Sequence, residues 1–269
     1  MKAAPFLCLF LLCGLITGCT QKPVPGQQVL ITQGIPHPVL DAYWVYLPKN
    51  YSKEKKWPMI MYLQGGDAAA SSYPGTVKDG GPVYYMLRQQ KETLPDSFII
   101  VNPHMKPGAQ EDRQWYQHAE GLIEIIDRAI EENNADPNRI YLTGLSRGGH
   151  GTWGVAKQYP EKFAAIAPIA GAITCKADCE KIQELPMWII HNDGDPVIDY
   201  EYPKNTVNHF EMELGKTFHQ TSGFQDNGLI QKPKLFTTLQ SNSHGGADRK
   251  AYTAPVFYHW LLTKRQNEE

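Results

Sequence analysis

Apolar residues are arranged along this chain in two alternating patterns. Short apolar runs rich in branched and aromatic side chains predict buried β-strands, and apolar positions that recur at helical spacing predict helices. The predicted strands cover residues 39–47, 59–63, 97–101, 140–142, 163–169, 186–191 and 234–239. The predicted helices cover residues 82–90, 118–133, 151–158, 202–214 and 253–264.

Strands that alternate with helices predict an α/β fold, with a mostly parallel central sheet and helices on both faces. The chain has 269 residues, of which 42% are hydrophobic. That length is enough for one large domain and too little for two ordinary enzyme domains. Asp136, Pro137 and Asn138 predict a turn before the strand at 140–142.

The N-terminus has the features of a secretory leader. A short positive start at Lys2 precedes an apolar run over residues 6–16, which is too short for an ordinary membrane span. The run ends in LITGC, which resembles the lipobox of bacterial lipoproteins, where the cysteine is lipidated. The alternatives are an uncleaved anchor or an ordinary secretory signal.

The lipobox resemblance implies a signal peptide over residues 1–18 and lipidation of Cys19. Residues 19–28 contain two prolines and a glycine and indicate a tether, so that the folded domain covers 29–269. We therefore expect an exported protein held by lipid to a bacterial membrane, in the periplasm or on the cell surface.

Composition limits the partners and cofactors. The chain has 26 basic and 28 acidic residues, a net charge of −2 and no basic block, so nothing favours a nucleic-acid partner. Outside the leader and Cys19, only Cys175 and Cys179 remain, too few for a four-ligand metal site. In an exported protein their spacing favours a disulfide over free thiols. We expect no metal and no cofactor.

The sequence GLSRG, residues 144–148, follows the strand at 140–142 and precedes a predicted helix. In this setting a G-x-S-x-G pentapeptide predicts a nucleophile elbow, a sharp turn that holds Ser146 in a strained conformation with its hydroxyl exposed. Gly144 and Gly148 flank the serine because a Cβ at either position would collide with the neighbouring strand or helix. The alternative is a glycine-rich turn with an incidental serine.

A serine hydroxyl needs a base, and the base needs a carboxylate to orient it. After the strand at 186–191 come three candidate acids, among which Asp195 is favoured over Asp193 and Asp199, because Gly194 and Pro196 shape its turn. After the strand at 234–239, His244 lies in a loop of small residues. The order of serine, acid and histidine is the one expected for this architecture. We expect His191 to support the loop that carries Asp195, which we call the acid loop, and His150 to lie in the second layer of residues around the serine.

An oxyanion that forms at the serine needs N–H donors. We expect one from the backbone of Arg147 and one from Gly66, which follows the strand at 59–63. Four further residues near the carboxyl edge of the sheet are candidate substrate contacts, although Trp115 is as well explained by packing. They are Gln64, Arg113, Trp115 and Tyr116.

Several stretches resemble the predicted-peptidase and phospholipase/carboxylesterase-like branch of the α/β-hydrolases. They are DPNRIYLTGLSRGGHGTW, YPEKFAAIAPIAG, LPMWIIHNDGDPVI, SHGGADRKAY and FYHWLL. Polyhydroxybutyrate depolymerases and feruloyl esterases are more distantly similar. The resemblance spans roughly residues 39–264 and implies the triad Ser146, Asp195 and His244. The chain departs from the family at Gln64, where many relatives have histidine, and at Arg147, where most have an uncharged residue.

The expected function is hydrolysis of carboxylic esters, acting on a small-molecule or glycan ester such as an acetyl, feruloyl or uronoyl ester. Arg147 would then either reinforce the oxyanion or favour an acidic substrate, unless it is a surface arginine. The alternatives are a peptidase of the same fold and a non-catalytic surface lipoprotein that binds a glycan or a partner.

Overall fold

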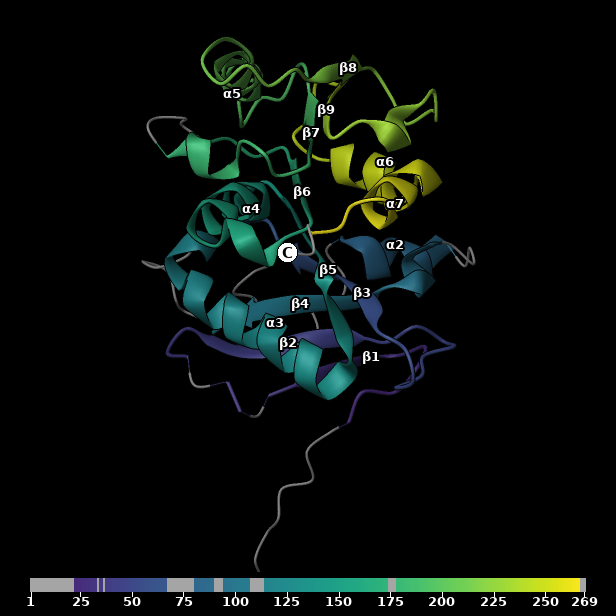
Figure 1. Ribbon diagram of the computed structural model, residues 1–269. Helices are drawn as coiled ribbons and strands as arrows, with labels where there is room; N and C mark the ends of the chain where they lie inside the picture. The colour runs from purple at the N-terminus through teal and green to yellow at the C-terminus, as the bar shows by residue number, and fades with distance from the viewer. Residues whose placement is uncertain are drawn as a thin grey trace, which may run out of the picture.

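The computed structural model describes residues 22–32, 34–35, 37–66, 80–89, 94–106, 114–173 and 178–266. Within these residues the centre of the fold is a nine-stranded sheet in the order β1-β2-β4-β3-β5-β6-β7-β9-β8 (Figure 1). The pairs β1–β2 and β2–β4 are antiparallel, and the other neighbours are parallel. The strands are β1 (Gln28–Ile31), β2 (Leu40–Tyr46), β3 (Trp57–Leu63), β4 (Ile99–Met105), β5 (Ala135–Leu145), β6 (Ala165–Ile169), β7 (Met187–Asn192), β8 (His219–Thr221) and β9 (Lys234–Leu239).

Helices cover both faces of the sheet (Figure 1). The helices are α2 (Pro82–Gln89), α3 (Ala119–Asn133), α4 (Arg147–Gln158), α5 (Glu201–Met212), α6 (Ala247–Tyr252) and α7 (Pro255–Leu262). Side chains of β3 alternate between two cores. Met59 and Met61 belong to the core that also contains residues of α3, α4 and α5, while Ile60 and Tyr62 belong to the core that contains residues of α2, α6 and α7. This division is the three-layer arrangement that the sequence predicts.

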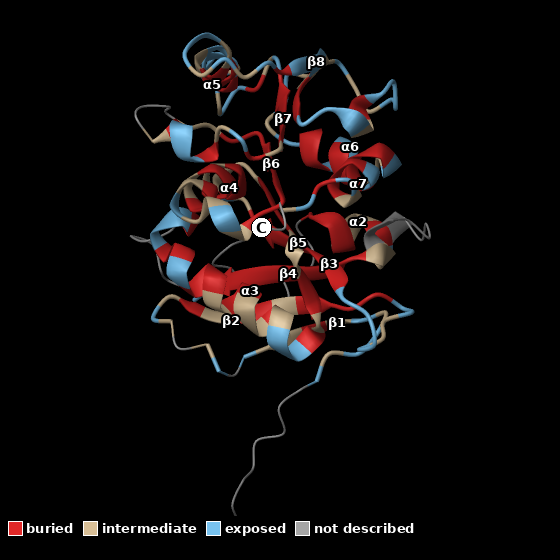
Figure 2. Cartoon of the chain, viewed as in Figure 1, coloured by how far each residue is buried: buried red, intermediate tan, exposed pale blue. Residues whose placement is uncertain are grey.

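Burial explains why the central strands are visible in the sequence. Every residue of β3, β4, β6 and β7 is buried, and Figure 2 shows the exposed residues on the outer helices and loops. A strand that is covered on both faces has a nearly continuous apolar sequence. No helix in the described part of the chain is long and apolar enough to cross a membrane.

All the predicted strands and helices are present, but some boundaries differ. The predicted turn at residues 136–138 is wrong, because β5 runs from Ala135 and includes it. Asp136 accepts the N–H of Asn138 at 3.1 Å and Arg139 Nε at 2.7 Å, which makes this start of the strand irregular. Helix α4 begins directly after the serine rather than at Gly151.

Three short elements were not predicted. Strands β1 and β8 and helix α6 have four, three and six residues, too few to show a clear periodicity. The end of the predicted tether also belongs to the fold: the N–H of Gly26 donates to the carbonyl of Leu47 at 2.8 Å, and Gln28 begins β1.

Candidate active site

Ser146 stands in a sharp turn between β5 and α4. Its φ of 57° and ψ of −113° lie in a region that residues other than glycine rarely adopt, so the predicted strain is present. The N–H of Ser146 donates to the carbonyl of Ile169 at 2.9 Å, and the serine carbonyl accepts the N–H of His150 at 2.9 Å. Backbone bonds to β6 and α4 therefore fix the turn.

Glycines allow this turn to pack against its neighbours. A Cβ on Gly148 would lie 1.8 Å from the carbonyl oxygen of Leu63 in β3, and one on Gly144 would lie 2.5 Å from Gly148. The predicted collisions are confirmed. On the other side of α4, a Cβ on Gly171 would lie 2.4 Å from the carbonyl carbon of Gly149. The helix thus contacts the sheet and the loop after β6 backbone to backbone.

His244 connects the serine to an acid. Its Nε2 lies 2.7 Å from Ser146 Oγ, and its Nδ1 lies 3.0 Å and 2.8 Å from the two carboxylate oxygens of Asp195. A carboxylate only accepts, so Nδ1 carries the proton and Nε2 is left to accept the serine hydroxyl. The three residues come from the ends of β5, β7 and β9, which the sheet brings together as the sequence predicts.

The loop after β7 holds Asp195 in its charged form. Oδ1 accepts the N–H groups of Val197 at 2.8 Å and Ile198 at 3.0 Å. Burial alone would raise the pKa of Asp195, but these two N–H groups and His244 outweigh it and lower the pKa. His191 donates from Nε2 to the Ile198 carbonyl at 2.9 Å, and burial lowers its pKa, so a neutral imidazole supports the acid loop as expected.

The other acids after β7 have structural roles. Asp193 accepts the N–H of Ser241 at 3.0 Å and so joins the acid loop to the loop after β9 rather than bonding its own turn. Asp199 accepts the N–H of Glu201 at 2.9 Å, at the start of α5. Asp195 is thus the carboxylate that meets His244.

The loop after β3 lies beside the elbow. A Cβ on Gly65 would lie 3.2 Å from Ser146 Cβ, and Gly66 has a φ of 52°. Side chains from other segments bond to the loop: Trp115 Nε1 donates to the carbonyl of Gln64 at 2.9 Å, and the Arg147 guanidinium donates to the carbonyl of Gly66. Gly66, Arg147 and Ser146 line one pocket of about 200 Å³.

The four candidate substrate contacts have different positions. Gln64 and Trp115 are fully buried, so neither faces the substrate side; the packing alternative for Trp115 is confirmed, because the ring belongs to the core. Tyr116 is 40% exposed and lies at the edge of a cleft. Arg113 lies outside the described residues.

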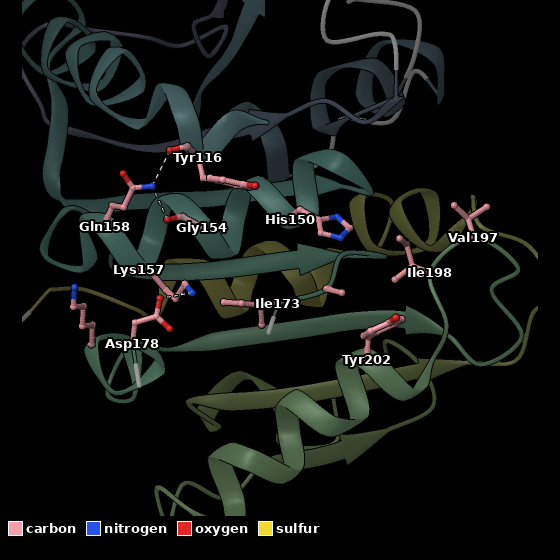
Figure 3. A pocket seen from close by; sticks show the side chains of 12 residues that line it. Tyr116, His150, Gly154, Lys157, Gln158, Ile173, Asp178, Val197, Ile198 and Tyr202 are labelled. Atoms are coloured by element: carbon pink, nitrogen blue, oxygen red, sulfur yellow. Dashed lines mark hydrogen bonds and ion pairs between the residues drawn. The ribbon is translucent and has the colours of Figure 1, made fainter. Parts of the chain in front are cut away.

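A cleft of about 720 Å³ adjoins the serine pocket, since His150 lines both. Figure 3 shows Tyr116 and Tyr202 beside the cleft and the ion pair between Lys157 and Asp178 at the end away from His150. The two charged atoms of the pair lie 2.6 Å apart, and the bond to Lys157 lowers the pKa of Asp178.

Sequence reasoning missed most of the cleft. A signal was present, because His150, Gly154, Lys157 and Gln158 recur at helical spacing on one face of α4 and include polar residues. The same spacing gives the cleft a length of about 12 Å along the helix. Tyr202 and Val197 come from other elements and had no signal of this kind.

The cysteine predictions fall partly outside the described residues. Cys179 is disulfide-bonded, and its partner is not among the described residues. Because Cys175 and Cys19 also lie outside them, the Cys175–Cys179 pairing and the lipidation of Cys19 stay predictions.

Curated proteins of related sequence include esterases and peptidases. A bifunctional acetylxylan esterase/xylanase of Neocallimastix patriciarum is 28% identical over 173 residues, which cover 63% of this chain and 24% of that protein. Acetylxylan esterase A of Emericella nidulans is 27% identical over 160 residues, 56% of this chain and 49% of that protein. Dipeptidyl-peptidase 5 of Porphyromonas gingivalis is 28% identical over 165 residues, 57% of this chain and 22% of that protein. The aligned regions thus span about a fifth to a half of these relatives' lengths.

Solved structures share the fold at low sequence identity. A thermostable esterase superposes with a TM-score of 0.65 and 22% identity, covering 89% of this chain and 63% of that chain. The feruloyl esterase module from Clostridium thermocellum, in complex with sinapinate, gives a TM-score of 0.62 and 15% identity, covering 92% and 93%. The sequence profile of the Phospholipase/Carboxylesterase family matches residues 81–228, more than half of the chain. The chain has the α/β-hydrolase fold and belongs to the phospholipase/carboxylesterase family.

Proposed function

We propose that the protein is a serine hydrolase that cleaves carboxylic esters through an acyl-enzyme formed on Ser146. The observation that carries the proposal is the continuous set of hydrogen bonds from Asp195 through His244 to Ser146 Oγ. A serine hydroxyl bonded to an unprotonated imidazole nitrogen can lose its proton as it attacks a carbonyl carbon.

In the first half of the reaction, Oγ of Ser146 bonds to the ester carbonyl carbon while its proton moves to Nε2 of His244. The charged Asp195 stabilises the resulting imidazolium through Nδ1. When the tetrahedral intermediate collapses, the bond to the alkoxy oxygen breaks, and that oxygen leaves as an alcohol with the proton from His244. Water then attacks the acyl-serine by the same route, and the carboxylic acid leaves.

The negative charge on the carbonyl oxygen needs donors that are in place before the reaction. Helix α4 begins at Arg147, so the N–H of that residue and the positive end of the helix dipole lie beside Ser146. Gly66 lines the same pocket from the opposite loop. We assign the backbone N–H groups of Arg147 and Gly66 to the oxyanion.

The lining of the two cavities supports a short acyl group on a carbohydrate alcohol. The pocket of about 200 Å³ beside Ser146 favours a small acyl part, and the cleft of about 720 Å³ accommodates a larger part of the substrate. Exposed tyrosine rings offer apolar faces with polar tips, and the Lys157–Asp178 pair offers donors and an acceptor for hydroxyl groups. The acetylxylan esterases among the relatives agree with this substrate class.

A peptidase is the second candidate, because dipeptidyl-peptidase 5 of P. gingivalis is as similar in sequence as the esterases. Both reactions need the same three residues, so the substrate decides between them. A panel of 4-nitrophenyl acetate, acetylated xylan, feruloylated xylan, glucuronate esters and aminoacyl anilides separates them by kcat/KM. Preference for the anilides would contradict the esterase assignment.

Ser146→Ala tests the proposal directly. We expect ester hydrolysis to fall by about 10⁴- to 10⁶-fold, because removing the nucleophile of such a unit costs nearly as much as removing all its members. The matched control is Ser222→Ala, an exposed serine after β8, which should leave kcat unchanged. Near wild-type turnover in the Ser146 variant contradicts the mechanism. No turnover in the wild type contradicts it as well and favours a non-catalytic binding protein.

We also propose that the protein is exported and anchored by lipid on Cys19. The LITGC sequence supports this, and stable anchoring implies more than one acyl chain on the cysteine, since one chain binds a membrane only marginally. Cys19→Ala should abolish labelling by a radioactive fatty acid and release the protein from the membrane fraction. A wild-type protein recovered without lipid and with another N-terminus would contradict the anchor.

A further inference from the structure

Arg147 connects the two loops that face the serine pocket. Its backbone begins α4 directly after Ser146, and its guanidinium reaches the loop after β3, where Nη1 donates to the carbonyl of Gly66. Among the described residues this carbonyl is the one hydrogen-bond acceptor of the guanidinium, and no ion pair there includes Arg147. The guanidinium of Arg147 therefore interacts with the loop after β3.

Gly66 is the part of the loop that needs such a partner. Its φ of 52° is one of several conformations open to glycine, and no heavy atom of the described residues lies within 4 Å of where its Cβ would be. Gly65 packs against the carbonyl of Leu145, whereas the described residues leave the Cβ side of Gly66 open. Trp115 holds the loop only as far as the carbonyl of Gln64. A charge-assisted hydrogen bond to the Gly66 carbonyl supplies the missing restraint.

We propose that the Arg147 side chain is a positioning residue that fixes Gly66, so that the Gly66 N–H stays aimed at the oxyanion. This inference rests on the proposed ester hydrolysis. Arg147 then contributes twice: its backbone N–H is one oxyanion donor, and its guanidinium holds the residue that gives the other. The alternative, that the guanidinium selects acidic substrates, predicts a different kinetic result.

The inference predicts a specific kinetic signature. Oxyanion donors act mainly on the transition state, so misplacing one lowers kcat and leaves KM nearly unchanged. A residue that recognises an acid group would instead change KM, and only for acidic esters. A surface arginine would change neither.

The experiment compares Arg147→Met with Arg128→Met on 4-nitrophenyl acetate. Arg128 is a matched control, because it also donates to the carbonyl of a glycine with positive φ, Gly34, but from α3. We expect Arg147→Met to lower kcat by about 10- to 10³-fold, the scale seen when one oxyanion donor is removed. Arg128→Met should leave kcat and KM unchanged, and Arg147→Lys, which keeps a charged donor, should recover part of the loss.

Binding of benzeneboronic acid gives a second readout, because its serine adduct resembles the tetrahedral intermediate. Its affinity should fall in Arg147→Met by the same factor as kcat/KM. Unchanged kcat and boronate affinity, or a loss confined to acidic esters, overturns the inference. If Arg147→Met does not fold, Arg147→Lys and Arg147→Gln carry the test: activity that follows donor strength supports the inference, and equal activity overturns it. The two proposals fail in different ways. If only the inference about Arg147 is wrong, hydrolysis still depends on Ser146. If hydrolysis survives Ser146→Ala, the proposed function itself is wrong.

Discussion

The elbow at Ser146 and the loop at Gly66 line the same pocket, but they are fixed in different ways. The elbow is held by its own main chain: backbone hydrogen bonds run to β6 and α4, and Gly148 leaves no room against β3. The loop also accepts hydrogen bonds from side chains of other segments, namely those of Trp115 and Arg147. The G-x-S-x-G motif therefore predicts the turn at Ser146, because the backbone of the motif itself fixes that turn. It does not predict the conformation of the loop at Gly66, which depends on residues far away in the sequence.

Among the variants that test this comparison, Gly148→Ala should lower the stability of the fold most. Its Cβ would lie 1.8 Å from the carbonyl oxygen of Leu63, and neither backbone can move without separating α4 from β3. We expect the free energy of unfolding in urea to fall by at least about 3 kcal/mol, the upper end for overpacking, or no folded protein to be recovered. A loss below about 1 kcal/mol would show that the elbow tolerates movement and would remove the contrast.

Asp195→Asn tests whether main-chain bonds fix the acid as they fix the elbow. Two N–H groups, from Val197 and Ile198, donate to Oδ1, so an asparagine must turn its oxygen toward them and its NH₂ toward His244. The imidazole would then take the wrong tautomer, and kcat should fall by about 10⁴-fold with little change in structure. A kcat within tenfold of wild type would show that His244 is oriented by something else.

The same variant gives a pH test of stability. The pKa of Asp195 is lower in the folded than in the unfolded chain, so the charge stabilises the fold above the unfolded value of about 4. This contribution is lost as the pH falls through the folded value. Urea unfolding at pH 6 and at pH 3 should therefore show a smaller difference between wild type and Asp195→Asn at the lower pH. A constant difference would contradict the lowered pKa.

Gly66→Ala should have a moderate effect, in contrast to Gly148→Ala. No atom of the described residues obstructs a Cβ there, so we expect the positive φ to set the cost, at about 1–2 kcal/mol. Because the loop can escape this strain by changing conformation, we expect kcat to fall more than thermal stability does. A destabilisation as large as that of Gly148→Ala would show that packing fixes the loop after all.

Among these variants, Trp115→Phe should change stability and kcat least. Phenylalanine keeps most of the buried ring but removes the Nε1–H bond to the Gln64 carbonyl, which costs about 1 kcal/mol. We expect a small fall in the melting temperature by calorimetry and a modest fall in kcat. No change in kcat would indicate that Arg147 holds the loop without help from the tryptophan.

The sequence predicted the fold well because buried strands have continuous apolar runs. It also brought Ser146, Asp195 and His244 to one edge of the sheet, since chain order and parallel pairing decide where strand ends meet. The edge strands β1 and β8 were not predicted, because they are short and partly exposed. The prediction of a turn at Asp136 was wrong, because the hydrogen bond from the N–H of Asn138 to the Asp136 side chain forms within strand β5.

Residues that act through tertiary contacts were harder to predict. Trp115 and Gln64 were candidate substrate contacts because each follows a strand at the same edge of the sheet, but both are buried in the folded chain. The bond from Arg147 to Gly66 joins residues 81 positions apart, and no local pattern encodes it. Tyr202 reaches the cleft only because α5 lies beside it.

The backbone contact between Gly149 and Gly171 determines where this enzyme can be redesigned. A mutational scan should find both positions, like Gly148, closed to every larger side chain. Val197 and Tyr202 on the rim of the cleft are 63% and 58% exposed and carry no such restriction. Libraries directed at the rim can therefore alter substrate range while the reacting groups keep their geometry, which makes selectivity and chemistry separately evolvable in this chain.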